Sequence, residues 1–315
     1  MSDVIKSATR AAFGKGLIKL GQERDDFIVL DADLAAATQT GKFKAAFPDR
    51  FYDCGIAEQN MISIAAGIAA TGKKVVASSF AMFAAGRAYE QIRNSIGYPH
   101  LNVIIGATHA GVSVGEDGAT HQCCEDIALM RTIPGMTIIN PADEVEAIKA
   151  LEAAFELDGP VYMRFGRLAV PIIFDDDYQF EIGKSKTLKD GNDVTVIATG
   201  LLVNEALIAY DILKNEGINA RIINMATIKP LDNKAIIKAA KETGAIVTAE
   251  EHNIIGGLGS AVAEVVAENC PVPVLRLGVN DVYGHSGPAD ALLDEFGLRA
   301  ANIVELAKKA VNLKK

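Results

Sequence analysis

Short apolar runs rich in β-branched residues alternate with helical stretches along this chain, and the alternation constrains the fold more than any other feature. In the first half, strand-like runs cover residues 27–30, 74–79, 102–107, 136–140 and 161–164. Their alternation with helical runs is typical of a parallel sheet covered on both faces. The pattern predicts an α/β fold built on a doubly wound, mostly parallel sheet.

The alternation starts again at residue 194, after a polar stretch. Strands are expected at 194–200, 219–224, 245–249 and 272–277. Residues 174–193 are charged and contain glycine, as a linker or an edge segment would. The length of 315 residues is enough for two ordinary domains. We predict two doubly wound domains, 1–175 and 194–315, joined by a linker at 176–193.

Charge and cysteine usage exclude several classes of protein. The net charge is −9 and basic residues cluster only in the carboxyl-terminal tail, which argues against a nucleic-acid surface. No apolar run is long enough to span a bilayer, and the polar amino terminus is unlike a signal peptide. Two of the four cysteines are adjacent and two are isolated, so they form no disulfide framework. We expect a cytoplasmic protein with no membrane or nucleic-acid partner.

Residues 53–60, with the sequence DCGIAEQN, bring one carboxylate to the start of an apolar helix. Gly55 lets the backbone turn out of a short strand, and the Ala-rich stretch that follows is typical of a buried helix. An acidic residue in a first helical turn is commonly explained by the helix dipole alone. The motifs that follow Glu58 indicate that it has a role beyond its interaction with the helix dipole.

Two aromatic residues and a Gly-rich loop follow the next two predicted strands. Phe80 and Phe83 come at the end of the strand at 74–79, and His109 follows the strand at 102–107. The loop carries Asp117 and His121 in the run GEDGATHQ. Loops at the carboxyl ends of parallel strands are where ligands bind, so this loop is a candidate ligand-binding segment.

Together these motifs resemble the transketolase family of thiamine diphosphate enzymes. The resemblance runs from near Arg10 to the end of the chain and corresponds to the carboxyl-terminal two thirds of a transketolase. The later phrases TIKPLD, EEHNIIGGLGSAVAE and YGHSG resemble the carboxyl-terminal domain of that family. The resemblance implies a thiamine diphosphate pyrimidine-binding fold at 1–175, followed by a transketolase C-terminal-domain fold at 194–315.

The resemblance assigns cofactor-binding roles to four residues. Glu58 matches the family's glutamate that bonds N1′ of the aminopyrimidine and promotes loss of the proton from C2 of the thiazolium, so it is also catalytic. Phe80 and Phe83 match the wall against which the pyrimidine stacks, with Phe83 the more direct contact. Asp33 lies in a family segment near the cofactor and substrate.

The same resemblance assigns substrate-binding roles in the Gly-rich loop and beyond. It places His121, as a second catalytic residue, at the reacting end of a ketose, Asp117 at a sugar hydroxyl and His109 near a distal phosphate. Arg10 and Arg164 match the two arginines that hold that phosphate. Arg167 is an alternative to Arg164, because the segment YMRFGR permits either alignment.

A missing motif predicts a partner. Thiamine enzymes hold Mg2+ or Ca2+ through a Gly-Asp-Gly motif and a later Asn, and this chain has no Gly-Asp-Gly. We expect no metal ligands here, and expect them instead on an N-terminal subunit that carries the diphosphate-binding domain. The chain should dimerise and recruit two such subunits, as an α2β2 assembly. The predicted function is transfer of a two-carbon ketol unit between ketose and aldose phosphates, as the C-terminal subunit of a split transketolase that is active only with its partner.

Several alternatives stay open. A 1-deoxyxylulose-5-phosphate synthase-like enzyme and a 2-oxo acid dehydrogenase beta-like subunit share parts of the pattern, and a non-catalytic scaffold is a reading from another class. The glycines at 256–259 permit a weak dinucleotide-loop reading, although the third glycine is absent. Departures from the family pattern at Ala37, Ala119 and Cys123 leave the sugar, and whether it is phosphorylated, undetermined.

Overall fold

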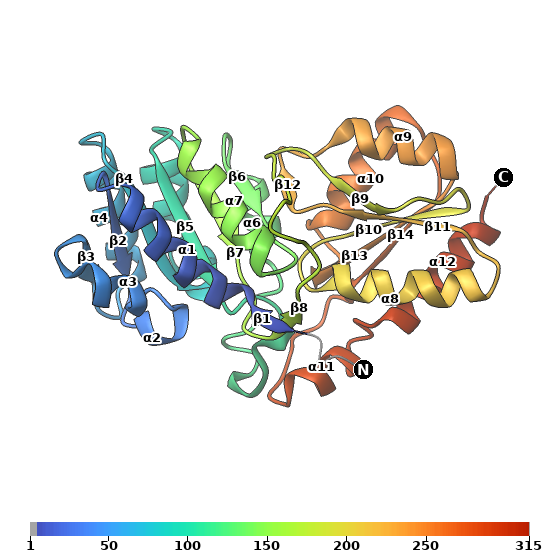
Figure 1. Cartoon of the computed structure of the whole chain (residues 1–315), viewed down its shortest axis with the longest axis horizontal. Coiled ribbons are helices and arrows are strands. Elements are labelled where there is room, and N and C mark those ends of the chain that lie inside the picture. Colours follow the sequence, from blue (N-terminus) through green and yellow to red (C-terminus); the bar gives the residue numbers. More distant parts are fainter. Residues whose placement is uncertain (1–4, 315) are drawn as a thin grey trace.

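The chain folds as two α/β units that lie side by side in a computed structural model, which describes residues 5–314 (Figure 1). The strands are β1 (Lys6–Ala8), β2 (Phe27–Asp31), β3 (Phe51–Asp53), β4 (Lys74–Phe80), β5 (Val103–Thr108), β6 (Thr137–Ile139), β7 (Val161–Arg164), β8 (Ala169–Pro171), β9 (Lys186–Lys189), β10 (Val194–Ala198), β11 (Ala220–Asn224), β12 (Thr227–Lys229), β13 (Ile246–Asn253) and β14 (Val274–Val279). Every strand run expected from the sequence coincides with one of these.

Helices connect the strands. The α-helices are α1 (Thr9–Glu23), α2 (Ala35–Thr38), α3 (Gly41–Ala46), α4 (Glu58–Ala69), α5 (Tyr89–Gln91), α6 (Asp126–Arg131), α7 (Glu144–Glu156), α8 (Leu202–Asn215), α9 (Asn233–Thr243), α10 (Leu258–Asn269), α11 (Ala289–Glu295) and α12 (Ala300–Asn312). Short 3-10 turns form η1 (Pro48–Arg50) and η4 (Val112–Asp117), and π-helical turns form η2 (Met82–Arg87) and η3 (Ile92–Gly97). None of the helices in residues 5–314 is both long and apolar enough to cross a membrane.

The first unit is a seven-stranded sheet covered on both faces. Its order is β12-β6-β7-β5-β4-β2-β3, and β12 is its antiparallel member. One face packs against α1, α3 and α7, and the other against α4, α6 and the π-helical turns. β4 and β5 are almost fully buried, as expected for central strands of a parallel sheet.

The second unit is a five-stranded sheet of order β14-β13-β10-β11-β9. Helices α8 and α12 cover one face, and α9 and α10 cover the other (Figure 1). The edge strand β9 runs antiparallel to β11 and lies within 176–193. Of the two possibilities that the sequence left for this segment, linker and edge, residues 186–189 are an edge strand.

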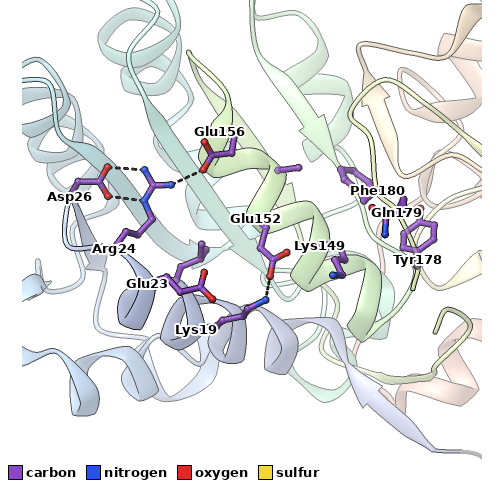
Figure 2. A pocket seen from close by; sticks show the side chains of 12 residues that line it. Lys19, Glu23, Arg24, Asp26, Lys149, Glu152, Glu156, Tyr178, Gln179 and Phe180 are labelled. Carbon is purple, nitrogen blue, oxygen red and sulfur yellow. Dashed lines mark hydrogen bonds and ion pairs between the residues drawn. The ribbon is translucent and has the colours of Figure 1, made fainter. Parts of the chain in front are cut away.

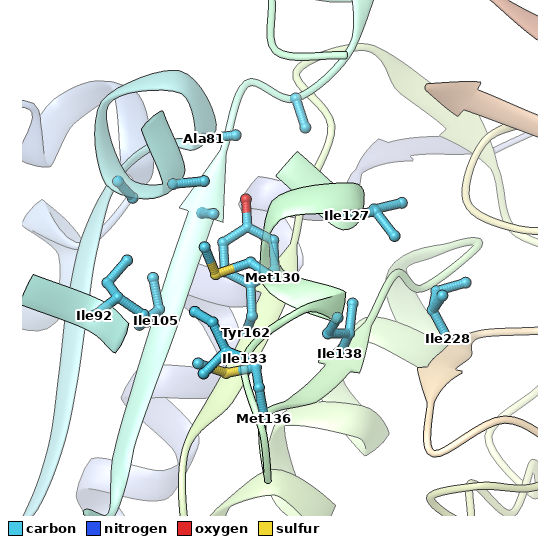
Figure 3. Close-up of a cluster of buried hydrophobic side chains, with 14 of the residues drawn as sticks. Ala81, Ile92, Ile105, Ile127, Met130, Ile133, Met136, Ile138, Tyr162 and Ile228 are labelled. Carbon is cyan, nitrogen blue, oxygen red and sulfur yellow. The ribbon is translucent and has the colours of Figure 1, made fainter. Parts of the chain in front are cut away.

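β12 was not expected, and it ties the second unit to the first. It follows β11 of the second sheet but pairs with β6, with Thr227 opposite Ile139. Ile228 of β12 therefore belongs to the same buried cluster as Ile138 and Tyr162 of the first sheet (Figure 3). Since this cluster also continues into α9 and α10, the hydrophobic core is shared between the units.

A buried carboxylate lies at the same junction. Glu146 of α7 accepts hydrogen bonds from the Tyr178 hydroxyl at 2.7 Å, from the Asn224 side-chain amide at 2.6 Å and from the Ala142 backbone N–H at 2.7 Å. Burial raises its pKa from the ordinary value of 4.5 to about 7, although these three donors oppose the shift. The folded chain therefore holds a proton on Glu146 in a pH range where the unfolded chain releases it.

This difference predicts a pH-dependent stability. Because the folded-state pKa is raised, the stabilisation is complete below about pH 4.5 and is lost as the pH rises through about 7. We expect Glu146 to lower the free energy of unfolding by at most about 1.4 kcal/mol per pH unit across that window. Urea unfolding at pH 5 and pH 7.5 should show a smaller pH effect in Glu146→Gln than in the natural chain. Glu156→Gln, at an exposed position of the same helix, is the control. Equal pH effects in the natural chain and Glu146→Gln would contradict the assignment.

Candidate active site

Most of the predicted site residues lie at the carboxyl edge of the first sheet. Phe80 ends β4, and His109 directly follows β5, the next parallel strand. Glu58 begins α4 shortly after β3, and Arg10 is in the first turn of α1. The parallel pairing of β4 with β5 brings Phe80 and His109 to one edge of the sheet.

Glu58 is almost completely buried and has one cationic partner. It is 1% exposed, and its Oε2 accepts a hydrogen bond from an Arg87 guanidinium N–H at 2.7 Å. Gly55, with φ of +70°, makes the turn that leads from β3 to α4. A carboxylate in such a place requires a partner, because an unpaired buried charge is strongly unfavourable.

Aromatic rings form a continuous row beside Glu58. The Arg87 guanidinium carbon lies 4.5 Å from the centre of the Phe83 ring, and Phe83 lies nearly parallel to Phe80 at 5.7 Å. Phe80 stacks on the His109 ring at 3.8 Å. His121 presents its ring nearly perpendicular to Phe83 at 5.2 Å. The row runs from the Glu58 carboxylate to the imidazole of His109.

His109 is neutral and its ring orientation is fixed. Its Nε2 lies 3.2 Å from an Arg10 guanidinium nitrogen, which can only donate, so Nε2 is the acceptor. Its Nδ1 lies 2.9 Å from the Thr108 hydroxyl. Burial, together with the charges of Arg10 and Arg167, lowers the pKa of His109 to about 3. Arg10 also donates to the Ala37 carbonyl at 2.7 Å, which ties α1 to the segment after β2.

Asp117 and Arg167 meet in the Gly-rich loop. The Arg167 guanidinium lies 3.4 Å from a Glu116 carboxylate oxygen and 3.8 Å from one of Asp117, and it donates to the Val114 carbonyl. The positive charge of Arg167 contributes to lowering the pKa of both Arg10 and His109. Arg167 therefore belongs to the same cationic end of the site as Arg10.

The second unit holds this loop in place. The Gln122 side-chain amide donates to the His285 carbonyl at 3.0 Å, and a side chain at Gly118 would meet the Ser286 hydroxyl at 2.4 Å. A cavity of about 600 Å³ lies between the two units, lined by Met82, Thr120 and Tyr283 among others. The C-terminal unit therefore positions part of the site wall.

Arg164 does not join these residues. It is 3% exposed, and it pairs with Asp126 at 2.8 Å and donates to the Glu251 carbonyl at 2.8 Å. Asp126 also accepts from the Tyr162 hydroxyl. The Arg164 guanidinium therefore makes its hydrogen bonds inside the junction between the two units. Of the two arginines that the sequence left open for a phosphate, the structure places Arg167 beside the site and Arg164 beneath it.

Asp33 is exposed and is not among the residues that form the row of rings. Its backbone N–H donates to an Asp53 carboxylate oxygen at 3.0 Å, and within residues 5–314 its own exposed carboxylate has no hydrogen bond or ion pair to the other predicted site residues. The sequence reading overlooked Asp31, the buried end of β2. Asp31 accepts from the hydroxyls of Thr38 and Thr40, and burial raises its pKa to about 6.

The dinucleotide-loop reading can be set aside, and Cys123 is not a candidate nucleophile. The turn at 256–259 is closed to an anion, because the Glu250 carboxylate already accepts from the Leu258 and Gly259 backbone N–H groups at the start of α10. Burial raises the pKa of the Cys123 thiol, so it stays protonated and is a poor nucleophile. Across residues 5–314, no group of three or more His, Cys, Asp or Glu side chains could hold a metal ion.

A groove of about 720 Å³ on the outer surface has a different character (Figure 2). It lies along α1 and α7 and is lined by the ion pairs Lys19–Glu152 and Arg24–Glu156. None of the predicted site residues lines it. Such exposed pairs are a solvated surface between two helices rather than a binding site.

Comparison with known proteins identifies the family. Residues 6–172 match the family described as "Transketolase, pyrimidine binding domain", and residues 183–303 match "Transketolase, C-terminal domain". The chain is 54% identical over 299 residues to "Putative transketolase C-terminal section" of Methanocaldococcus jannaschii, covering 94% of both. The chain belongs to the transketolase family.

Other relatives of this transketolase-family chain agree. "6-deoxy-6-sulfo-D-fructose transketolase subunit SqwH" of Clostridium sp. is 43% identical over 298 residues, which are 95% of this chain and 92% of that protein. A solved chain described as "Split gene transketolase, inactive beta4 tetramer" superposes with a TM-score of 0.90 at 51% identity, covering 98% of this chain and 99% of that one. The transketolase of Rattus norvegicus is 41% identical, and the match covers 97% of this chain but 49% of that protein. The chain spans about half of that relative, rather than the two thirds expected from the sequence.

Membership of this family implies dependence on thiamine diphosphate. The chemistry of the residues fits the pyrimidine half of that cofactor, because a buried carboxylate and an aromatic face stand side by side at Glu58 and Phe83. Arg87 is the residue of this group that the sequence reading gave no role. The sequence feature that could have identified Arg87 is its spacing of four residues from Phe83, which places both side chains on one face of a helix.

The two arginines should differ sharply in their effect on stability. Arg164→Met leaves the buried Asp126 carboxylate without its cation, so the free energy of unfolding should fall by about 3 kcal/mol or more. Arg167→Met removes a partly exposed charge and should cost less than about 1 kcal/mol. Urea unfolding of both variants at pH 7 provides the comparison. Equal losses would mean that Arg164 does not hold the junction between the units.

Proposed function

We propose that the chain is the C-terminal subunit of a split transketolase and, with a separate N-terminal subunit, transfers a two-carbon ketol unit from a ketose phosphate to an aldose phosphate. The observation that supports it most is the row of side chains from Glu58 to His109 and Arg10. One end of that row suits the pyrimidine of thiamine diphosphate and the other suits an anion. When bound, the cofactor supplies the carbon nucleophile that takes up the two-carbon unit.

Glu58 is the residue for proton transfer at the cofactor. Its carboxylate is buried, so it is shielded from water and can share a proton with a nitrogen of the pyrimidine, N1′. Phe83, backed by Phe80, presents the apolar face on which that ring would lie. His121 stands beside Phe83, where it can donate to or accept from oxygens at the reacting end of the sugar.

The cationic end suits a sugar phosphate. Arg10 and Arg167 carry the charge, whereas the neutral His109 can contribute a hydrogen bond only. Guanidinium groups bind phosphate through paired N–H donors, which suits a dianion at the distal end of the sugar. Asp117, held near Arg167, can accept from a sugar hydroxyl. We propose a peripheral cofactor-binding role for Asp33, which only the family resemblance supports.

The partner subunit would supply the diphosphate anchor and its metal, Mg2+ or Ca2+. This chain has no Gly-Asp-Gly motif, and the relatives named above include a "C-terminal section" and a split-gene chain described as an inactive beta4 tetramer. Those names suit a subunit that is inactive alone. We propose an α2β2 assembly that is located in the cytoplasm. Its role would be two-carbon transfer in pentose phosphate metabolism.

Reconstitution with the N-terminal subunit tests this function. The mixture should convert ketose and aldose phosphates in the presence of thiamine diphosphate and Mg2+, whereas each chain alone should not. Glu58→Gln keeps the size and a hydrogen bond but cannot exchange a proton, so deuterium exchange at cofactor C2 should slow by about 10²- to 10⁴-fold in the assembly. Pyruvate as the preferred donor would favour the synthase or dehydrogenase alternative. An unchanged exchange rate in Glu58→Gln would remove Glu58 from catalysis.

The two ends of the site should respond differently to the donor. Arg167→Ala and Arg10→Ala should lower kcat/KM for a ketose phosphate by an amount that corresponds to about 1–3 kcal/mol of transition-state stabilisation. The kcat/KM for the unphosphorylated donor hydroxypyruvate should stay nearly unchanged. His121→Ala should lower kcat/KM for both donors, since it contacts their shared end. Steady-state kinetics with the two donors measure this split. If Arg167→Ala reduced both donors equally, Arg167 would have no place in phosphate binding.

A further inference from the structure

The Arg87 guanidinium occupies the position between Glu58 and Phe83. It donates to the Glu58 carboxylate at 2.7 Å, and its carbon lies 4.5 Å from the centre of the Phe83 ring. One planar group therefore contacts both a buried carboxylate and an aromatic face. Any other planar group that contacts both must use the same space.

A guanidinium and an aminopyrimidine have the relevant chemistry in common. Both are flat, both carry N–H donors at their edge, and both stack on aromatic rings. The proposed function requires a pyrimidine nitrogen on Glu58 and the pyrimidine ring against Phe83. We propose that Arg87 is a placeholder for the pyrimidine of the cofactor: it fills this position in the cofactor-free chain and must leave it when the cofactor binds. This proposal rests on the proposed function.

The placement of Arg87 allows such an exchange. The Glu58 side chain is 1% exposed but the Arg87 side chain is 47% exposed, so the guanidinium can reach water without any change in the core. Its backbone stays tied to α4, because the Gln59 side-chain amide donates to the Arg87 carbonyl at 3.2 Å. The swing is therefore confined to a long side chain whose rotamers are freely accessible in solvent.

The pair also explains how the chain can fold without its cofactor. A buried carboxylate with no cation nearby would be costly, and Arg87 removes that cost. The same contact then competes with the cofactor, because the binding-competent state is the fraction of chains in which Arg87 has left Glu58. Arg87 thereby sets both the stability of the free subunit and its apparent affinity for thiamine diphosphate.

The free chain offers the first test, by a double-mutant cycle. Arg87→Met should lower the melting temperature by several degrees, because it leaves Glu58 unpaired. In a Glu58→Gln background the same change should lower it by less than about half as much, since no charge is left unpaired. Arg93→Met, an exposed arginine of the following π-helical turn, is the matched control and should show no such coupling. Equal effects of Arg87→Met in the two backgrounds would overturn the pairing.

Cofactor affinity in the complex with the N-terminal subunit offers the second test. Calorimetric titration with thiamine diphosphate and Mg2+ should give a Kd about 5- to 30-fold lower for Arg87→Met than for the natural chain, and an unchanged Kd for Arg93→Met. Arg87→Lys should bind with intermediate affinity, because it keeps the charge but loses the flat donor edge. Binding that is unchanged or weaker in Arg87→Met would overturn the placeholder role and leave the proposed function standing. No binding by the natural complex would overturn the proposed function, and the placeholder role with it.

Discussion

The buried Arg164 guanidinium, paired with Asp126 within the first unit, makes one of the contacts that join the two units. Arg164 ends β7 of the first sheet and donates to the carbonyl of Glu251 in β13 of the second. Cys123 contributes its carbonyl to the same guanidinium, so the end of the Gly-rich segment is held by the same residue. Because both side chains are buried, breaking the pair is costly. The junction therefore fixes the position of the wall of the site.

Glu58 imposes a second constraint, which acts within the site. The helix that it begins packs its apolar residues against the first sheet, and this burial removes the carboxylate from water. A charged group there is stable only beside a cation or a bonded nitrogen. In the proposed function Glu58 transfers a proton, and the burial that suits this role also requires a cation beside the carboxylate when the cofactor is absent. Arg87 is the cation that donates to it.

The sequence predicted the strands and the edge at which the site forms, because buried parallel strands and the loops that follow them have strong local signals. It could not place β12, since a three-residue strand has too little periodicity to reveal which sheet it joins. It could not separate Arg164 from Arg167, because Arg164 ends β7 and Arg167 follows it closely, and only the hydrogen bond to β13 shows that the Arg164 side chain is enclosed. Arg87 was overlooked because its partner lies 29 residues earlier.

At both ends of the site an arginine pairs with a carboxylate of the same chain. Arg87 covers the Glu58 carboxylate at one end, and at the other Arg167 lies near the carboxylates of Glu116 and Asp117. The second pair is looser, at 3.4 and 3.8 Å, and its carboxylates are 68% and 40% exposed, so it is weaker than the pair at Glu58. Pairing of this kind offsets the cost of burying the Glu58 carboxylate. In the proposed function these internal contacts must be broken before a ligand binds, so the free energy of each broken contact is lost from the free energy of binding.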